Sequence, residues 1–421
     1  MISNRQATNR IVIVLLLIMP VCLITGIVFA VMFPGEITSA LCYTTFLLTS
    51  LEMIVLLLIL LVAVQRCGGL RRVVNRYMIR EAIDNNLLAI GAYVKPDDGR
   101  NIVITPKVSF DRRGNIVIHL SNMNVRQKIE SRIDVLSTAL PENMICRKAY
   151  LDKSGKVLTI EYDDLTSDRT LVFSSLNDYR RYVRSFKKTV LVIDDKTTID
   201  LRKHTGLLIT GSPGSGKSYF VRELIIQGLI KKYDIRILDR KATYQMFRDR
   251  TTFVTRPDAI IEELEEISRE IDTRAEAMDQ ILVDNPNAVA CDYGFPVMIV
   301  VIEEYLALSA DESISSKEMK HIESLIKRIT TMGRQLSIHP IIVMQVSSAD
   351  ALNSDIRGAI PVRMVFGVAN ETIYRTAFGL SNVPKIAYKF EPGEGLGMID
   401  GDQFMYRIPE IQYSGREINE I

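Results

Sequence analysis

The chain has 421 residues, which is enough for two or three domains with substantial cores. Its 52 basic and 50 acidic residues give a net charge of +2, so composition alone does not predict a nucleic-acid partner. The five cysteines form no C-x-x-C pair and the four histidines lack metal-ligand spacing, which argues against a disulfide framework and a zinc site.

Two apolar stretches dominate residues 1–65. Residues 11–33 carry no charge, and residues 41–64 carry only Glu52. Each stretch is long enough to cross a bilayer, so we predict a transmembrane hairpin; the first is too long for the apolar core of a cleaved signal peptide. Glu52 should face a neighbouring helix or subunit because a lipid-facing carboxylate is costly, unless nearby polar side chains simply tolerate it.

Arginines lie on both sides of this hairpin. Arg5 and Arg10 precede it, and five arginines follow it before the first acidic residue: Arg66, Arg71, Arg72, Arg76 and Arg80. By the positive-inside rule, we expect a cell-membrane protein with both termini in the cytoplasm. Residues 66–99 are interpreted as a basic juxtamembrane linker, which could also contact anionic lipid or DNA.

Residues 100–180 predict a small α+β domain. The turn sequences "DRRG" and "KSG" each separate two strand-like segments, which indicates two hairpins. A polar helix is expected between them, at about residues 125–140. No catalytic constellation is found in this domain.

Residues 181–410 alternate strand-like and helix-like segments, and residues 411–421 form a short tail. The apolar strands are "LLIT", "IRILD", "VMIVVIEEY", "IIVMQ" and "VRMVFGV", and one of the intervening helices opens with Pro257. This alternation predicts an α/β fold whose parallel sheet is covered on both faces. Ligands of such sheets bind at the carboxyl ends of the strands.

The segment "GLLITGSPGSGKSYF" contains a glycine-rich turn between an apolar strand and a helix. It fits the phosphate-binding pattern G-x-x-x-x-G-K-[ST], in which glycines let backbone N–H groups point at phosphates. Lys217 would reach the β- and γ-phosphates of ATP, and Ser218 would ligate Mg²⁺. The predicted ATP-binding residues are Gly211, Ser212, Pro213, Gly214, Ser215, Gly216, Lys217 and Ser218.

Two later strands end in polar residues that such a loop requires. Glu303 and Glu304 close one strand; we assign Glu303 to Mg²⁺ and Glu304 to polarising the attacking water. Gln345 closes another strand, where its amide could sense the γ-phosphate or orient water. The alternative for Glu303 and Glu304 is a pair of exposed acids after a core strand, and the alternative for Gln345 is a polar residue at a strand end without a role in catalysis.

The order of these motifs resembles the motor domain of FtsK/SpoIIIE-type DNA translocases. The segments that carry the likeness are "GLLITGSPGSGKSYF", "IRILDRK", "VMIVVIEEY", "RITTMGRQLSIHPIIVMQ" and "GAIPVRMVFGVANETIYRTAFG", within about residues 180–405. Within the family, the chain looks like the membrane-anchored coupling ATPases of Gram-positive conjugative plasmids and integrative elements. The resemblance implies a P-loop NTPase (RecA-like) motor that couples ATP hydrolysis to DNA translocation.

Further roles are implied by the resemblance alone. Gln345 matches the sensor glutamine of the family. Arg363 lies where the family has an arginine that can serve a neighbouring subunit's γ-phosphate, and Arg375 is a second candidate. An arginine that acts on a neighbouring subunit (an arginine finger) requires a ring of subunits, so the resemblance implies a homo-hexamer. It also implies DNA of either strand form, a relaxase and transfer-channel proteins as partners. The alternative for Arg363 is a structural ion pair within its own subunit.

Some positions depart from the family pattern. Glu303 stands where aspartate is usual, and Met344 and Val346-Ser347 replace the usual residues on either side of the sensor glutamine. The chain ends at Ile421 without a winged-helix domain for reading chromosomal orientation, which leads us to expect conjugative transfer rather than chromosome or plasmid partition. A protein-export (type VII-like) ATPase and a non-hydrolysing membrane adaptor are the alternatives of another class; such export motors usually carry several ATPase domains, and this chain has one P-loop.

Overall fold

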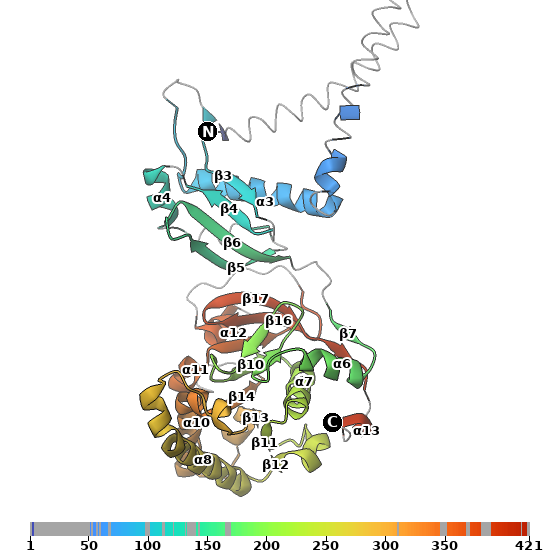
Figure 1. Cartoon of the computed structure of the whole chain (residues 1–421), viewed down its shortest axis with the longest axis vertical. Coiled ribbons are helices and arrows are strands. Elements are labelled where there is room, and N and C mark those ends of the chain that lie inside the picture. Colours follow the sequence, from blue (N-terminus) through green and yellow to red (C-terminus); the bar gives the residue numbers. More distant parts are fainter. Residues whose placement is uncertain are drawn as a thin grey trace, which may run out of the picture. The chain divides into compact units, whose positions relative to one another are not determined.

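The computed structural model divides the chain into two compact units, residues 1–162 and 163–421, which are described separately below (Figure 1). It describes residues 70–96, 102–413 and 415–418, together with residues 2–3 and scattered positions between 51 and 69. The gaps within those ranges are 112–113, 121, 131, 133–139, 142–143, 165–169, 310, 346–351, 368–370 and 380–388.

The predicted membrane spans fall largely outside this description. Span 11–33 is not described at all, and only scattered positions of span 41–64 are. Among the helices that the structure does describe, none is both long and apolar enough to cross a bilayer.

The first unit is a four-stranded antiparallel sheet with helices packed on it. Its elements are β1 (Ile2–Ser3), α3 (Leu70–Ala89), β2 (Ile102–Val103), β3 (Lys107–Phe110), β4 (Ile116–His119), α4 (Met123–Glu130), β5 (Met144–Leu151) and β6 (Val157–Asp164). The sheet order is β3-β4-β6-β5, so both predicted hairpins are present. The basic helix α3 is part of this fold rather than a linker, because Ile79, Ile83 and Leu87 are buried in the core.

The second unit is built on an eight-stranded sheet. The elements before its central strands are β7 (Val172–Phe173), α6 (Leu176–Arg184), β8 (Val190–Val192) and β9 (Thr198–Asp200). The middle of the unit comprises β10 (Leu207–Gly211), α7 (Lys217–Ile230), β11 (Asp234–Asp239), η1 (Gln245–Arg250), β12 (Thr252–Val254), α8 (Pro257–Asp284), η2 (Ala290–Tyr293), β13 (Met298–Glu303), α9 (Tyr305–Ser309), α10 (Ser316–Leu336) and β14 (Ile338–Met344). It ends with α11 (Ser354–Ala359), β15 (Val362–Phe366), α12 (Glu371–Phe378), β16 (Glu394–Ile399), β17 (Asp402–Arg407), β18 (Glu410–Ile411) and α13 (Gly415–Ile418).

The strand order of the large sheet is β12-β11-β13-β14-β10-β15-β16-β17. The first six strands in that order are parallel, as predicted, because each is connected to the next in sequence by a crossover. Strands β16 and β17 extend the sheet as an antiparallel hairpin that the sequence analysis did not predict. Strand β8 does not join this sheet but pairs with β9 in a separate two-stranded ribbon.

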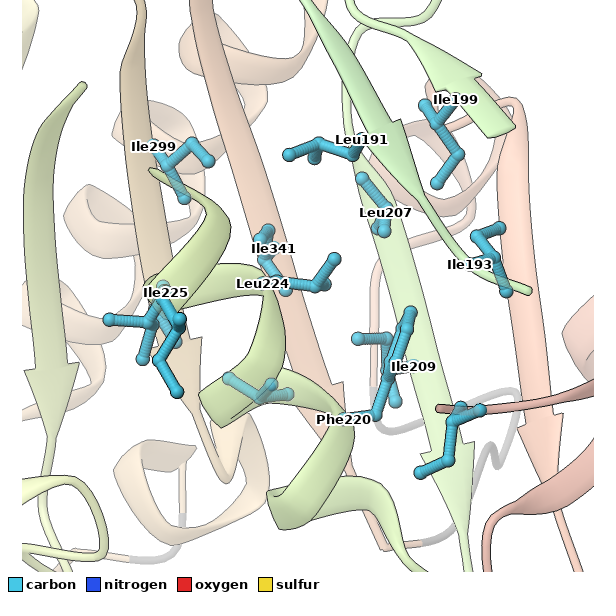
Figure 2. Packing of buried hydrophobic residues seen from close by; sticks show 14 of the residues in the cluster. Leu191, Ile193, Ile199, Leu207, Ile209, Phe220, Leu224, Ile225, Ile299 and Ile341 are labelled. Carbon is cyan, nitrogen blue, oxygen red and sulfur yellow. The ribbon is translucent and has the colours of Figure 1, made fainter. Parts of the chain in front are cut away.

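Helices cover both faces of the sheet, because successive strand residues point to opposite faces and nearly all of them are apolar. On one face, Leu207 and Ile209 of β10 and Ile341 of β14 pack with Phe220 and Leu224 of α7 (Figure 2). On the other face, Leu208 of β10 belongs to a second core formed with α8, α10 and α11. The prediction of an α/β fold with two covered faces is confirmed.

The start of the second unit differs from the predicted boundary near residue 180. Helix α6 begins after Ser175, whose side chain accepts a hydrogen bond from the Asp178 N–H at 3.2 Å. Its buried residues Leu176, Tyr179 and Val183 lie in the core beneath α7. The second unit therefore includes this helix, and the division falls between Tyr162 and Asp163.

Buried polar side chains at the amino ends of the parallel strands are paired with backbone carbonyls. Arg274 of α8 is 1% exposed and donates to Pro296 O at 2.9 Å and Leu336 O at 2.8 Å, just before β13 and β14. The Nδ1–H of His339 in β14 donates to Thr205 O at 2.8 Å. Burial lowers the pKa of His339 to about 4, so the ring is neutral at pH 7.

Candidate functional site

The predicted site residues gather at the carboxyl ends of three strands. β10 leads into the glycine-rich loop, β13 ends in Glu303, and β14, which lies between them, is followed by Gln345. The three strands are parallel, so the loop, the acids and the amide share one edge of the sheet.

The glycine-rich loop adopts a conformation that requires its glycines. Gly211 has φ +151°, and a Cβ there would lie 2.5 Å from Phe366 O. Gly216 has φ +101° and precedes the first turn of α7; a Cβ there would lie 2.6 Å from the backbone N of Gly393. The loop is also held by a hydrogen bond from Gly393 N–H to Ser215 O at 2.9 Å. These close approaches fix the backbone that precedes the helix N-terminus.

Lys217 is buried and points back into the loop. Its Nζ donates to Gly211 O at 2.6 Å and Ser212 O at 2.9 Å. Burial lowers the pKa of Lys217, and the negative charges of Glu303 and Glu304 oppose that shift. The Ser215 hydroxyl is buried without a hydrogen-bond partner in the described part of the chain. The loop thus presents a cation and a spare hydroxyl where an anion can bind.

Glu303 is 5% exposed and lies among other polar groups. The Tyr244 hydroxyl donates to Glu303 Oε2 at 2.7 Å. Burial raises the pKa of Glu303 to about 7; the Tyr244 hydrogen bond lowers it, and the charges of Asp239 and Glu304 raise it further. A nearby cation would favour its ionised form.

Glu304 follows β13 with φ +50°, a left-handed conformation that is unusual for a residue with a side chain. It is 6% exposed, and its Oε2 lies 3.3 Å from Lys241 Nζ. The two predicted acids are therefore buried beside the loop, which excludes the alternative that they are an exposed acidic pair.

The two arginines proposed as finger residues have different environments. Arg363 lies on β15 near the amino end of the strand and donates to four carbonyls of its own chain: Arg357 O at 2.9 Å, Ile360 O at 2.9 Å, Ala377 O at 3.4 Å and Phe378 O at 2.9 Å. This pairing is that of a structural residue within its own subunit, with carbonyls as partners instead of an acid. Arg375 is exposed on α12.

A pocket opens beside the loop. It has a volume of about 570 Å³ and is lined in part by Gly216, Tyr219, Pro392, Gly393 and Ile408. Its lining also includes Thr170, Glu391, Glu394, Arg407 and Glu410, so it offers both apolar and polar groups beside the phosphate-binding loop, as a nucleotide's base and ribose require.

The oxygen donors near the loop fit a magnesium ion bound together with a nucleotide. Ser218 is in the first turn of α7, and its hydroxyl interacts with the Tyr244 phenol, which in turn bonds Glu303. In the described part of the chain, no group of three acidic, histidine or cysteine side chains could hold a metal ion. Phosphate oxygens of the nucleotide and water would complete the shell around Ser218 and Glu303, which is how Mg²⁺ usually binds.

Sequence reasoning missed three residues of the site: Asp239, Lys241 and Tyr244. All follow β11, the neighbour of β13, and in the sheet Asp239 lies opposite Glu303. A polar cluster directly after an apolar strand was the available signal, since "ILDRK" ends a strand as "VIEEY" does.

Comparison with known proteins places these features in a family. Residues 177–294 match the FtsK/SpoIIIE family. DNA translocase FtsK of Staphylococcus aureus strain Mu50 is 26% identical over 248 residues, which is 54% of this chain and 30% of that protein. DNA translocase FtsK of Helicobacter pylori strain J99 is 30% identical over 195 residues, or 43% of this chain and 22% of the relative. The chain thus spans less than a third of the length of these relatives.

A solved structure shares the fold across most of the chain. The pCW3 conjugation coupling protein TcpA, in a monomer form with ATPγS, matches with a TM-score of 0.51 and 19% identity, covering 82% of this chain and 98% of that one. The family match over residues 177–294 lies within the second unit, and together with the assembled nucleotide site it identifies that unit as an FtsK/SpoIIIE-type ATPase domain.

Proposed function

We propose that this protein is a membrane-anchored, ATP-driven DNA translocase that delivers DNA to a conjugative transfer channel. The observation that carries the proposal is the assembly of Lys217, Glu303 and Glu304 at one sheet edge, two acids facing a phosphate-binding loop. DNA as the substrate is supported by the FtsK relatives, and conjugation by the likeness to the coupling protein TcpA.

Within this proposal each site residue has a task. The loop N–H groups and Lys217 bind the phosphates of ATP, and Lys217 exchanges its two carbonyl partners for phosphate oxygens. Mg²⁺, held by Ser218 and Glu303, would neutralise charge on the terminal phosphates. Glu304 orients and polarises the attacking water, and Gln345, which follows the strand between loop and acids, contacts the γ-phosphate.

Anchoring in the cell membrane is supported by exposed apolar side chains near the start of the chain. Leu51, Ile54, Val55, Leu58, Leu60, Leu61 and Val62 are each between 45% and 58% exposed. A run of exposed apolar residues is unfavourable in water and is what a lipid-facing segment requires. The proposal also includes a homo-hexameric ring, in which Lys and Arg contacts to DNA phosphates grip the substrate without reading its sequence.

The test is ATP hydrolysis by the full chain in detergent, with single-stranded DNA, double-stranded DNA or neither. Stimulation by DNA that is absent from a Lys217→Ala variant is the expected result, and the strand form that stimulates identifies the substrate. Hydrolysis that ignores both DNAs in an assembled ring would instead favour protein export. If conjugative transfer persisted with Glu304→Gln, which should still bind ATP, the protein would be a non-hydrolysing adaptor.

Partition of chromosomes or plasmids is distinguished in cells. A transfer-deficient Lys217→Ala strain with normal plasmid inheritance agrees with the conjugative role. Plasmid loss with normal transfer would assign the motor to partition.

A further inference from the structure

The two acids at the site are both held by one short loop, residues 239–244, which follows β11. The loop contributes no residue to the phosphate-binding pattern, and neither family resemblance nor sequence spacing gave it a task. Its contacts explain how Glu303 and Glu304 keep their positions beside Lys217.

The loop is fixed at its base by Asp239. This side chain is fully buried and accepts hydrogen bonds from Lys241 N–H at 2.9 Å and Tyr244 N–H at 3.0 Å. Asp239 also lies opposite Glu303 in the β11–β13 pairing. The turn is therefore tied both to its own strand and to the strand that carries the acids.

Tyr244 reaches Glu303 from this turn. Its ring is fully buried in the core beneath α7, so the hydroxyl cannot swing away. It donates to Oε2 of Glu303 at 2.7 Å. One carboxylate oxygen is thereby restrained, which leaves Oε1 to face another partner.

Lys241 reaches Glu304 from the same turn. Its Nζ lies 3.3 Å from Glu304 Oε2; the lysine side chain is 47% exposed, whereas that of Glu304 is 8% exposed. The carboxylate is thus held from the solvent side while its backbone is fixed in a left-handed conformation. An ion pair of this kind sets the direction of a buried acid.

We propose that the 239–244 loop is a positioning element for hydrolysis: Tyr244 orients Glu303 for the metal ion, and Lys241 orients Glu304 for the attacking water. The inference rests on the proposed ATPase function. Groups that orient a metal ligand or a base typically change affinity or rate by 10- to 100-fold when removed.

The first variant is Tyr244→Phe, which removes one hydroxyl and keeps the buried ring. Binding of Mn²⁺ to the ADP-loaded full chain, measured by electron paramagnetic resonance, should weaken about tenfold. Nucleotide binding in EDTA should stay within twofold of wild type, because the phosphate-binding loop is intact. The matched control is Tyr182→Phe on α6, whose ring packs on Phe173 and Phe186 away from the acids.

The second variant is Lys241→Met, compared with Lys241→Arg and with Lys320→Met, which changes an exposed position on α10. The methionine variant should lower kcat about tenfold with KM for ATP and Mn²⁺ affinity unchanged, and arginine should restore most of the rate. In a Glu304→Gln background, Lys241→Met should have no further effect, because it acts through Glu304.

These outcomes separate the inference from the proposed function. If wild type and both controls fail to hydrolyse ATP, the ATPase proposal is wrong, while the Mn²⁺ measurement still tests Tyr244. If the controls hydrolyse ATP, unchanged Mn²⁺ affinity in Tyr244→Phe overturns its role. An unchanged or higher kcat in Lys241→Met, or an added loss in the Glu304→Gln background, overturns the role of Lys241.

Discussion

The two edges of the central sheet use buried polar side chains in opposite ways. At the amino ends of the strands, Arg274, His339 and Arg363 donate to backbone carbonyls of their own chain. At the carboxyl ends, Lys217 donates to carbonyls of the glycine-rich loop, and the Ser215 hydroxyl has no hydrogen-bond partner among the described residues. Hydrogen bonds to carbonyls that stay in place stabilise the fold. Hydrogen bonds that a bound phosphate can replace leave their donors available for binding a nucleotide.

The largest effect that tests this contrast is expected from Lys217→Ala. The substitution removes the ammonium group that would leave its two carbonyl partners and bind phosphate oxygens instead. The rate of ATP hydrolysis should therefore fall by at least about 1000-fold. Thermal unfolding without nucleotide should change little, because the two carbonyls can bond to water. A large loss of stability in the nucleotide-free state would place Lys217 with the structural residues instead.

Glu304→Gln should lower kcat by about 1000-fold while ATP binding is retained. The amide keeps the size of the side chain but is a much weaker base. Single-turnover hydrolysis and equilibrium ATP binding, measured on the same preparation, check the separation. If binding and rate fell together, the residue would act in holding the nucleotide rather than in the chemical step.

His339 belongs to the structural edge and should make the motor sensitive to acid. Its pKa is lowered from 6.5 to about 4, so the unfolded chain binds a proton more readily than the folded one. This contribution to stability is present above pH 6.5 and is lost as pH falls towards 4; it amounts to on the order of 3 kcal/mol. Between pH 6.5 and pH 4, the free energy of unfolding of His339→Asn should therefore fall less than that of the wild type.

The measurement for His339 is denaturant unfolding followed by circular dichroism at several pH values, since the chain contains no tryptophan. Nucleotide binding at neutral pH should not differ between the two proteins. Equal acid sensitivity of variant and wild type would show that other groups titrate instead.

Arg363→Met tests the same edge with a smaller effect. Loss of its hydrogen bonds to four carbonyls should lower the free energy of unfolding by about 2 kcal/mol, with the ATPase rate per folded molecule unchanged. Mixing the variant with Glu304→Gln subunits gives a second check. If Arg363→Met alone abolished hydrolysis and mixing with Glu304→Gln subunits restored part of it, Arg363 would serve a neighbouring subunit as the family resemblance implied.

Much of the sheet could be predicted from sequence because its strands are apolar on both faces. Each of the strands β10, β11, β13, β14 and β15 overlaps a predicted apolar run, although β14 begins three residues before its run. The antiparallel pair β16–β17 was missed although Asp400-Gly401 between its strands is a hairpin signal, with φ +52° and +92°.

The candidate site was predictable only in part. The loop and the acids follow from residue types at strand ends, which are local signals. The contacts of Tyr244 and Lys241 depend on β11 lying beside β13, and that neighbourhood is not encoded in any local pattern. The same holds for Arg363, whose carbonyl partners come from α11 and α12.

The position of β10 between β14 and β15 also determines when the motor can form during synthesis. Leu207 pairs with Ile341 on one side and with Val362 on the other, so both neighbours of this strand are made more than a hundred residues after it. A ribosome that has just released residues 206–220 exposes a nucleotide-binding sequence without the strands that support it. The nucleotide-binding loop therefore cannot gain its supporting sheet until both β14 and β15 have been synthesised.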